Sequence, residues 1–208
     1  SLAYNLKGNN ITIFDKSWRP GGRVSTRKNN QLIFDHGAHY LSKNHDIKQL
    51  RDLLDQLNIV EEKIINFSTN YLKKEFIEKK ILIGKNGMNS IPRKIFDNLN
   101  IESHFNSKII NIEKNNNKYT LITENEKYSN FDLLLVCIPF LQAQELTNKF
   151  IDFNIDHEPK YEPIYTVMLS YEKDNNINID GGLNLHKDLS FFMKQNFKFP
   201  DLKDECWV

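Results

Sequence analysis

Runs of apolar residues in this chain predict where its buried strands lie. The clearest run, LLLVCI at residues 133–138, is followed by Pro139 and predicts a strand buried on both faces, as in a parallel sheet. The shorter run ITIF at residues 11–14 is β-branched and aromatic, and it predicts a second buried strand. Because Cys137 lies inside the first run, we expect its thiol to be core rather than reactive.

Apolar residues at helical spacing predict helices elsewhere. The segment HDIKQLRDLLDQLNI predicts an amphipathic helix whose apolar face is formed by Ile47, Leu50, Leu53, Leu54 and Leu57. The segment NSIPRKIFDNLN predicts another, because Asn89 or Ser90 can cap its start and Pro92 falls in its first turn. A further helix is expected through LQAQELTN, and SLAYNLKGNN has the pattern of the last turns of a helix closed by Gly8.

The remaining segments are predicted to be extended. QLIFDHGAHYLS is interrupted by Gly37, KIINFSTNYLKKEFIEKKILI predicts a strand pair, and the KNNNK turn in SKIINIEKNNNKYTLITENEKYS predicts a hairpin or meander. YTVMLSYEK and LSFFMKQN predict two more strands. Near Ile151 the composition shifts to Asp, His, Glu and Pro, which marks the expected domain boundary.

Composition narrows the range of partners. Lys and Arg number 28 and Asp and Glu 27, and this balance gives no sign of a nucleic-acid or membrane-surface partner. No apolar run approaches the roughly 18 residues of a membrane span, and none resembles a signal peptide. Two distant cysteines, Cys137 and Cys206, make neither a disulfide framework nor a metal knuckle, which favours a reducing, cytoplasmic setting.

Both ends of the sequence have the pattern of a piece of a longer chain. The opening segment is the end of a helix without a start, and the final DECWV stops on apolar, strand-like residues without a closing turn. We therefore expect the sequence to be a fragment.

The stretch ITIFDKSWRPGGR carries the candidate chemistry. Asp15 follows the first predicted strand, where a carboxylate can accept two hydrogen bonds from a ribose diol, although such an Asp is more often a turn former. Gly21 and Gly22 let the main chain approach a phosphate or a ring closely, and the Arg23 guanidinium can meet an anion. The order of acid, basic turn and Gly-Gly-Arg after a buried strand is more specific than any of its parts.

This block, followed by FDHGAHYLS, resembles the flavin-dependent amine oxidase superfamily. Within it, the chain is most similar to renalase and the bacterial renalase-like NAD/FAD-dependent oxidoreductases. GMNSIPRKIFDNL, the segment from SKIINIEK to LLLVCIPFLQAQEL, and PIYTVMLSYEK with the final CWV resemble later parts of that branch in the same order. The resemblance covers nearly all 208 residues.

The resemblance implies an α/β fold, with a Rossmann-type FAD-binding domain and an inserted α+β substrate domain, both truncated. The FAD-binding domain would comprise residues 1–44 and 84–150, and the substrate side residues 45–83 and 151–208. The cofactor would be FAD. The residues expected to bind it are Asp15 at the adenosine ribose, Gly21, Gly22 and Arg23 at the pyrophosphate and flavin, His39 and Tyr40 against the flavin, Ile109 at the adenine, and also Lys16.

The implied reaction is hydride transfer from a small reduced substrate, either an amine or a dihydronicotinamide, to the flavin. No catalytic residue can be assigned. Histidine at position 39 departs from the family pattern, which often has Gln-Tyr there. The family's N-terminal strand with its Gly-x-Gly-x-x-Gly turn and its C-terminal Gly-Asp segment are not in the sequence. We therefore expect unpaired edges at ITIFD and LLLVCI, poor FAD binding and a tendency to aggregate.

Alternatives stay open at this point. His36 and His39 lack the further ligands of a metal site, Tyr40 could be a core aromatic, and Lys16, like Arg19, is of a type more often found on solvated surface. A separate set could either wall a substrate pocket or belong to the core: Phe191, Phe192 and Trp207. For the whole protein, the alternatives are a non-catalytic remnant, a flavin desaturase or isomerase, and a methyltransferase.

Overall fold

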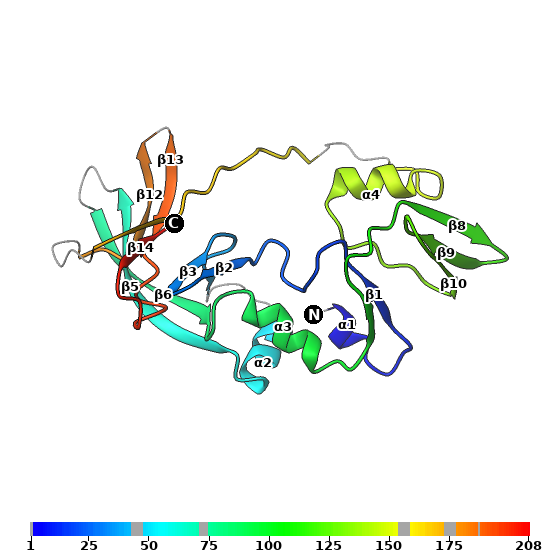
Figure 1. Ribbon diagram of the computed structural model, residues 1–208, viewed down its shortest axis with the longest axis horizontal. Helices are drawn as coiled ribbons and strands as arrows, with labels where there is room; N and C mark the ends of the chain where they lie inside the picture. Colours follow the sequence, from blue (N-terminus) through cyan, green and yellow to red (C-terminus); the bar gives the residue numbers. More distant parts are fainter. Residues whose placement is uncertain (1, 43–47, 71–74, 154–158, 173–177, 187) are drawn as a thin grey trace. The chain divides into compact units, whose positions relative to one another are not determined.

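A computed structural model describes residues 2–42, 48–70, 75–153, 159–172, 178–186 and 188–208 of the chain. The contacts within the chain divide it into two compact units. The first unit comprises Ser1–Ile11, Pro20–Asn100 and Tyr165–Val208, and the second comprises Thr12–Arg19 and Ile101–Ile164. Both units contain helices and strands, so the fold class is α/β as the sequence indicates (Figure 1).

A five-stranded sheet with the order β13-β12-β5-β6-β4 forms the centre of the first unit. Its long antiparallel pair, β5 and β6, confirms the predicted strand pair, and β12 lies parallel to β5. The predicted strand in LSFFMKQN is confirmed as β13. The bounds are β4 Leu41–Ser42, β5 Val60–Asn70, β6 Glu75–Gly84, β12 Gly181–His186 and β13 Leu189–Met193.

Smaller elements complete the first unit. The hairpin of β2 and β3 contains the start of QLIFDHGAHYLS, and β11 pairs antiparallel with β14. The predicted strand in YTVMLSYEK is confirmed only over the three residues of β11. The bounds are β2 Thr26–Asn29, β3 Leu32–Asp35, β11 Leu169–Tyr171, β14 Glu205–Trp207, α1 Leu2–Asn5, α2 Lys48–Gln56 and α3 Ser90–Asp97.

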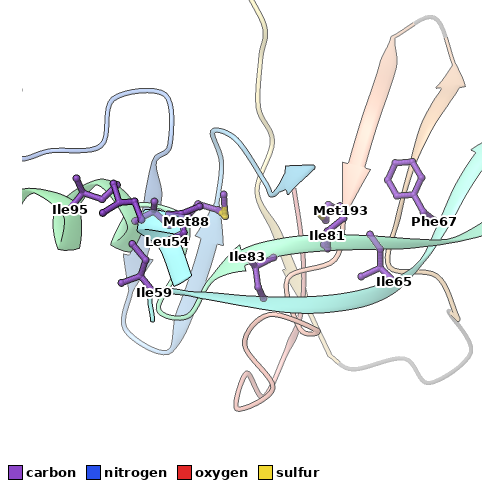
Figure 2. Packing of buried hydrophobic residues seen from close by; sticks show 11 residues of the cluster. Leu54, Ile59, Ile65, Phe67, Ile81, Ile83, Met88, Ile95 and Met193 are labelled. Carbon is purple, nitrogen blue, oxygen red and sulfur yellow. The ribbon is translucent and has the colours of Figure 1, made fainter. Parts of the chain in front are cut away.

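The core of the first unit lies where α2 and α3 pack on the sheet (Figure 2). The amphipathic pattern of α2 is confirmed, because Leu53 and Leu54 are buried; Ile47 lies outside the described residues. The side chains that fill the core come from both helices, from three strands and from the connections next to them: Leu53, Leu54, Ile59, Ile65, Phe67, Ile81, Ile83, Met88, Ile91, Ile95 and Met193.

The start of α3 differs from its prediction in one respect. Pro92 lies in the first turn as expected, and Asn89 occupies the cap position, but the Asn89 side chain makes no capping hydrogen bond. Instead, the Asn89 main-chain N–H donates to the Thr26 hydroxyl at 3.1 Å. The helix is therefore attached to β2 by a tertiary contact rather than capped by its own side chain.

The second unit contains a parallel strand pair and an antiparallel meander. β1, Thr12–Phe14, pairs with β7, Glu102–His104, and the meander has the order β10-β9-β8. Its bounds are β8 Asn111–Asn115, β9 Lys118–Ile122 and β10 Lys127–Phe131, and helix α4 spans Phe140–Thr147. Asn116 and Asn117 join β8 to β9 with φ angles of 49° and 61°, the pair of positive values that a two-residue type I′ turn requires.

The strand predicted for residues 133–138 is not formed, so this prediction was wrong. Among the residues that the structure describes, no strand pairs with this run. Leu133 is 69% exposed, and Cys137, expected in the core, is exposed as well. A strand buried on both faces exists only between hydrogen-bonded neighbours, and here the run has none. Among the described strands, β1 pairs with β7 alone.

Candidate functional site

Asp15 lies in the second unit, directly after β1. Its main-chain N–H donates to the carbonyl of His104 at 3.0 Å, and its carboxylate Oδ1 accepts from the main-chain N–H of Ser17 at 2.8 Å. The carboxylate thus closes an Asx turn, which is the ordinary role of a strand-ending Asp. The structure shows this role and leaves ribose binding as a prediction.

The other two candidate residues of the second unit have ordinary surface or half-buried positions. Lys16 is exposed, and Ile109 is half-buried just before β8, next to Ile110, whose N–H donates to the carbonyl of Ile122. Trp18 is 66% exposed and carries the Arg19 guanidinium over its ring at 4.1 Å. Asp15, Lys16 and Ile109 belong to one unit, and the remaining candidates belong to the other.

In the first unit, the Gly-Gly-Arg turn lies against the start of the HGAHY segment. The Gly21 carbonyl accepts from Val24, and the Arg23 carbonyl accepts from the Ala38 N–H at 2.8 Å. A Cβ at Gly37 would lie 2.2 Å from that same Arg23 oxygen, so only glycine fits there. At Gly22, whose φ is +51°, an added Cβ would meet no heavy atom within 4 Å. The turn is therefore packed on one side and open at Gly22.

A buried ion pair lies beside this turn, and the sequence interpretation missed both of its members. The ammonium Nζ of Lys198 lies 3.0 Å from Oδ2 of Asp35, and both side chains are 1% exposed. Lys198 also donates to the carbonyl oxygen of His39 at 2.6 Å. Burial lowers the pKa of Lys198, while the Asp35 carboxylate opposes that shift.

Asp35 gathers hydrogen bonds from segments that are distant in sequence. Its Oδ1 accepts from the Thr26 hydroxyl at 2.6 Å and from the main-chain N–H of Met88 at 2.9 Å. Its own main-chain N–H donates to the Gln195 side-chain oxygen at 2.9 Å. A buried carboxylate is stable only with such a set of partners. Asp35 therefore joins the β2–β3 hairpin, the turn before α3 and the C-terminal segment.

His39 carries the most distinctive polar atom of this region. Its Nδ1 is buried and has no hydrogen-bond partner among the described residues, and its ring packs on Phe191 with centroids 4.6 Å apart. Burial, and to a lesser extent the Lys198 charge, lower the pKa of His39 to about 4 against the opposing effect of Asp35. The imidazole is therefore neutral at neutral pH.

Tyr40 is held by a lysine from β6. The ammonium of Lys79 donates to the Tyr40 hydroxyl at 2.7 Å, lies 4.6 Å from the centroid of the Tyr40 ring, and lies 4.7 Å from that of Phe67. Phe67 and Phe191 are in turn 6.4 Å apart. His39 and Tyr40 are thus joined to one aromatic group of the first unit.

The aromatic residues considered for a pocket wall divide into two places. Phe191 belongs to the group around His39, whereas Phe192 lies 5.7 Å from the ring of Trp207. Among the described residues, no group of three His, Cys, Asp or Glu side chains is close enough to hold a metal ion. None of the described helices is long and apolar enough to cross a membrane.

Sequence features for Asp35 and Lys198 were present but not decisive. Asp35 ends an apolar strand in FDHGAHY, and Lys198 stands between two aromatic residues in NFKFPD. A charged residue in an apolar setting indicates burial with a partner. The partner itself lies 163 positions away, and nothing local identifies it.

Comparison with known proteins places the chain in a family. A model described as "Flavin containing amine oxidoreductase" matches residues 66–192, more than half of the chain, and one described as "NAD(P)-binding Rossmann-like domain" matches residues 1–57. The chain therefore belongs to the flavin-containing amine oxidoreductase family. This membership confirms the superfamily that the sequence resembles, places the protein among the oxidoreductase enzymes, and argues against the methyltransferase alternative.

Solved structures share the fold. A protein from Exiguobacterium sp. 255-15 assigned as a protoporphyrinogen oxidase has a TM-score of 0.71 at 12% identity, over 99% of this chain and 72% of that one. Wild-type putrescine oxidase bound to putrescine has a TM-score of 0.66 at 11% identity, over 100% and 71%. A putrescine oxidase variant with redesigned cofactor binding is similar at 0.67 and 11%, over the same shares. No curated protein sequence matches the chain.

Proposed function

We propose that the protein is an FAD-dependent oxidoreductase of renalase-like type, which accepts hydride from a small reduced substrate. The observation that carries the proposal is a pair of contacts in the first unit: the Arg23 carbonyl accepts from the Ala38 N–H, and Lys198, paired with Asp35, donates to the His39 carbonyl. A family of flavin-containing amine oxidoreductases supplies the chemical class.

The residues of the first unit fit a flavin on two observations. The main chain at Gly22 is open, so that a flat ring or a phosphate can approach it without meeting a side chain. The buried Nδ1 of His39 has no partner among the described residues, and a ligand atom would satisfy it. When bound, the flavin supplies the redox chemistry of hydride acceptance.

The chain's own residues would bind and orient the cofactor. Gly21, Gly22 and Arg23 would meet its pyrophosphate and ring, while His39 and Tyr40 would face the ring. In the second unit, Asp15 would bind the adenosine ribose and Ile109 the adenine, and Lys16 would also contact the cofactor. Because His39 is neutral at neutral pH, it adds no positive charge next to the flavin.

The domain assignment follows from the same proposal. Residues 1–44 and 84–150 would form the FAD-binding domain, and residues 45–83 and 151–208 would form the substrate side. The Rossmann-like match over residues 1–57 supports the first assignment at its N-terminal part. The substrate is proposed to be a small amine or a dihydronicotinamide, with putrescine oxidase as a structural relative that binds an amine.

Titration with FAD tests the proposal. We expect Gly22→Val to weaken FAD binding about tenfold or more, because a branched side chain would occupy the open approach of the ligand and glycine's φ of +51° disfavours valine. Flavin fluorescence at increasing protein concentration gives both dissociation constants. Gly8→Val is the matched control, because Gly8 also has a positive φ with open space around it and lies outside the proposed site.

Equal affinities of the Gly22→Val variant and the wild type would contradict the placement of the flavin. The two substrate classes are then separated by anaerobic mixing of the FAD-loaded protein with a dihydronicotinamide or with a primary amine. Bleaching of the flavin absorption by only one of them identifies the hydride donor. Bleaching by neither contradicts the proposed reaction.

A further inference from the structure

Lys198 is the most deeply buried cation that the structure describes, and the proposed function gives it no contact with the cofactor. Its ammonium group donates to Oδ2 of Asp35 at 3.0 Å and to the carbonyl of His39 at 2.6 Å. Burying a lysine is costly unless its charge is paired and its hydrogens are bonded. A plain core position would not require a charged side chain there.

The contact of Lys198 with the His39 carbonyl links this lysine to the proposed flavin site. The hydrogen bond from Lys198 to the His39 carbonyl restrains the main chain of His39, whose imidazole is proposed to face the flavin. The other restraint on His39 is the packing of its ring on Phe191. Between these two contacts, the imidazole is held with Nδ1 buried and unpartnered among the described residues.

We propose that Lys198 is a positioning residue: anchored by Asp35, its ammonium group fixes the main chain of His39 and presents the His39 imidazole as a preformed hydrogen-bonding group for the flavin. The proposal rests on the proposed function, because it takes the flavin as the ligand of that imidazole. It assigns Lys198 no contact with the substrate and no part in proton transfer.

The pKa of His39 reports on the charges around it, so the proposed role of Lys198 can be measured. Three titratable groups act on its imidazole: Lys198 and His36 lower its pKa, and Asp35 raises it. The effect of Lys198 is larger than that of Asp35. Removing the lysine charge therefore raises the pKa of His39, and a variant that keeps the charge leaves that pKa low.

The first experiment follows the His39 imidazole by NMR during a pH titration, with His39→Gln to assign the signal. We expect Lys198→Met to raise the pKa of His39 from about 4 by about one unit or more, and Lys198→Arg to keep it low. Lys203→Met is the matched control, since Lys203 is exposed and lies in the same segment. An unchanged pKa in folded Lys198→Met would overturn the proposal.

A double variant covers the case in which Lys198→Met fails to fold. Asp35→Asn with Lys198→Met removes both members of the ion pair, which is usually tolerated far better than removing one. Because the effect of Lys198 exceeds that of Asp35, the pKa of His39 is still expected to rise, by less than in the single variant. A pKa at or below that of the wild type would overturn the proposal.

The second experiment measures FAD affinity in the same set of proteins. We expect about tenfold weaker binding for Lys198→Met, near-wild-type binding for Lys203→Met, and partial recovery for Lys198→Arg. Equal FAD affinity of Lys198→Met and the wild type would overturn the positioning role even if the pKa changes. Absence of FAD binding in the wild type would contradict the proposed function itself, and the imidazole titration distinguishes that outcome.

Discussion

At the scale of single residues, the first unit depends on a few buried polar groups that each make several hydrogen bonds. The Thr26 hydroxyl is representative, since it donates to Asp35 and accepts from the Asn89 N–H while Thr26 is 1% exposed. Leaving a buried N–H and a carboxylate oxygen without a partner costs more than the hydrogen bond contributes when formed.

We expect Thr26→Val to lower the free energy of unfolding by about 1–3 kcal/mol, because valine keeps the shape and removes both hydrogen bonds. Urea denaturation monitored by circular dichroism measures the change. Thr120→Val is the control: the Thr120 hydroxyl bonds to Ser129 in an exposed pair, and its loss should cost less than about 0.5 kcal/mol. Equal effects at the two positions would contradict the importance of the buried network.

His39 makes stability depend on pH in a defined window. Its pKa is about 4 in the folded chain against 6.5 in the unfolded one, so between these values the unfolded chain binds more protons. Stability therefore falls as the pH is lowered from 6.5 to about 4, by about 3 kcal/mol at 1.36 kcal/mol per unit. Unfolding free energies of the wild type and His39→Gln across this range test it, and parallel curves would contradict the assignment.

At the scale of elements, the turn from β6 into α3 is a tight junction of the first unit. Gly87 has a φ of +96°, and a Cβ there would lie 2.8 Å from both the hydroxyl oxygen and the methyl carbon of Thr26. The turn thus requires glycine for its backbone conformation and again for space, because it presses against the residue that bonds to Asp35.

We expect Gly87→Ala to destabilise the chain by about 3 kcal/mol or more, since strained backbone and steric overlap combine. Gly8→Ala provides the comparison: its φ is +100°, but a Cβ there meets nothing within 4 Å, so only about 1–2 kcal/mol of backbone cost is expected. Thermal or urea unfolding of both variants measures the difference. Similar losses would show that space at Gly87 is not limiting.

At the scale of the whole molecule, apolar surface is unusually plentiful. Leu133, Leu135 and Ile138 are each 45% exposed or more, and Ile164 and Tyr165 reach 84% and 94%. The run at residues 133–138 combines high β-propensity with an absence of charge, which is the pattern of a segment that associates between chains.

We expect the double substitution Leu133→Asp and Leu135→Asp to raise the highest concentration at which the chain is still monomeric by about tenfold. The added charges oppose strand pairing between chains. Static light scattering over a concentration series measures it. The control is Asn10→Asp with Asn125→Asp, which also takes the formal net charge from +1 to −1 at two exposed polar positions. If the control works equally well, net charge rather than the apolar run governs association.

Local patterns predicted those features whose cause is local. The spacing of Leu53 and Leu54 marked α2, the placement of Pro92 marked α3, and the KNNNK stretch marked the β8–β9 turn. The pattern failed at residues 133–138, because apolar residues state a preference for burial and pairing but do not provide the neighbouring strand.

Local sequence patterns specify the helices, the turns and the Gly-Gly-Arg segment, and with them the resemblance to flavin-dependent amine oxidases. Tertiary structure alone decided which buried charge meets which. Asp35 and Lys198 are 163 positions apart, and Thr26, Met88 and Gln195 reach the same aspartate from three further places. The physical reason is that each local pattern reflects short-range propensity, whereas a buried ion pair forms only when the chain brings distant partners within hydrogen-bonding distance.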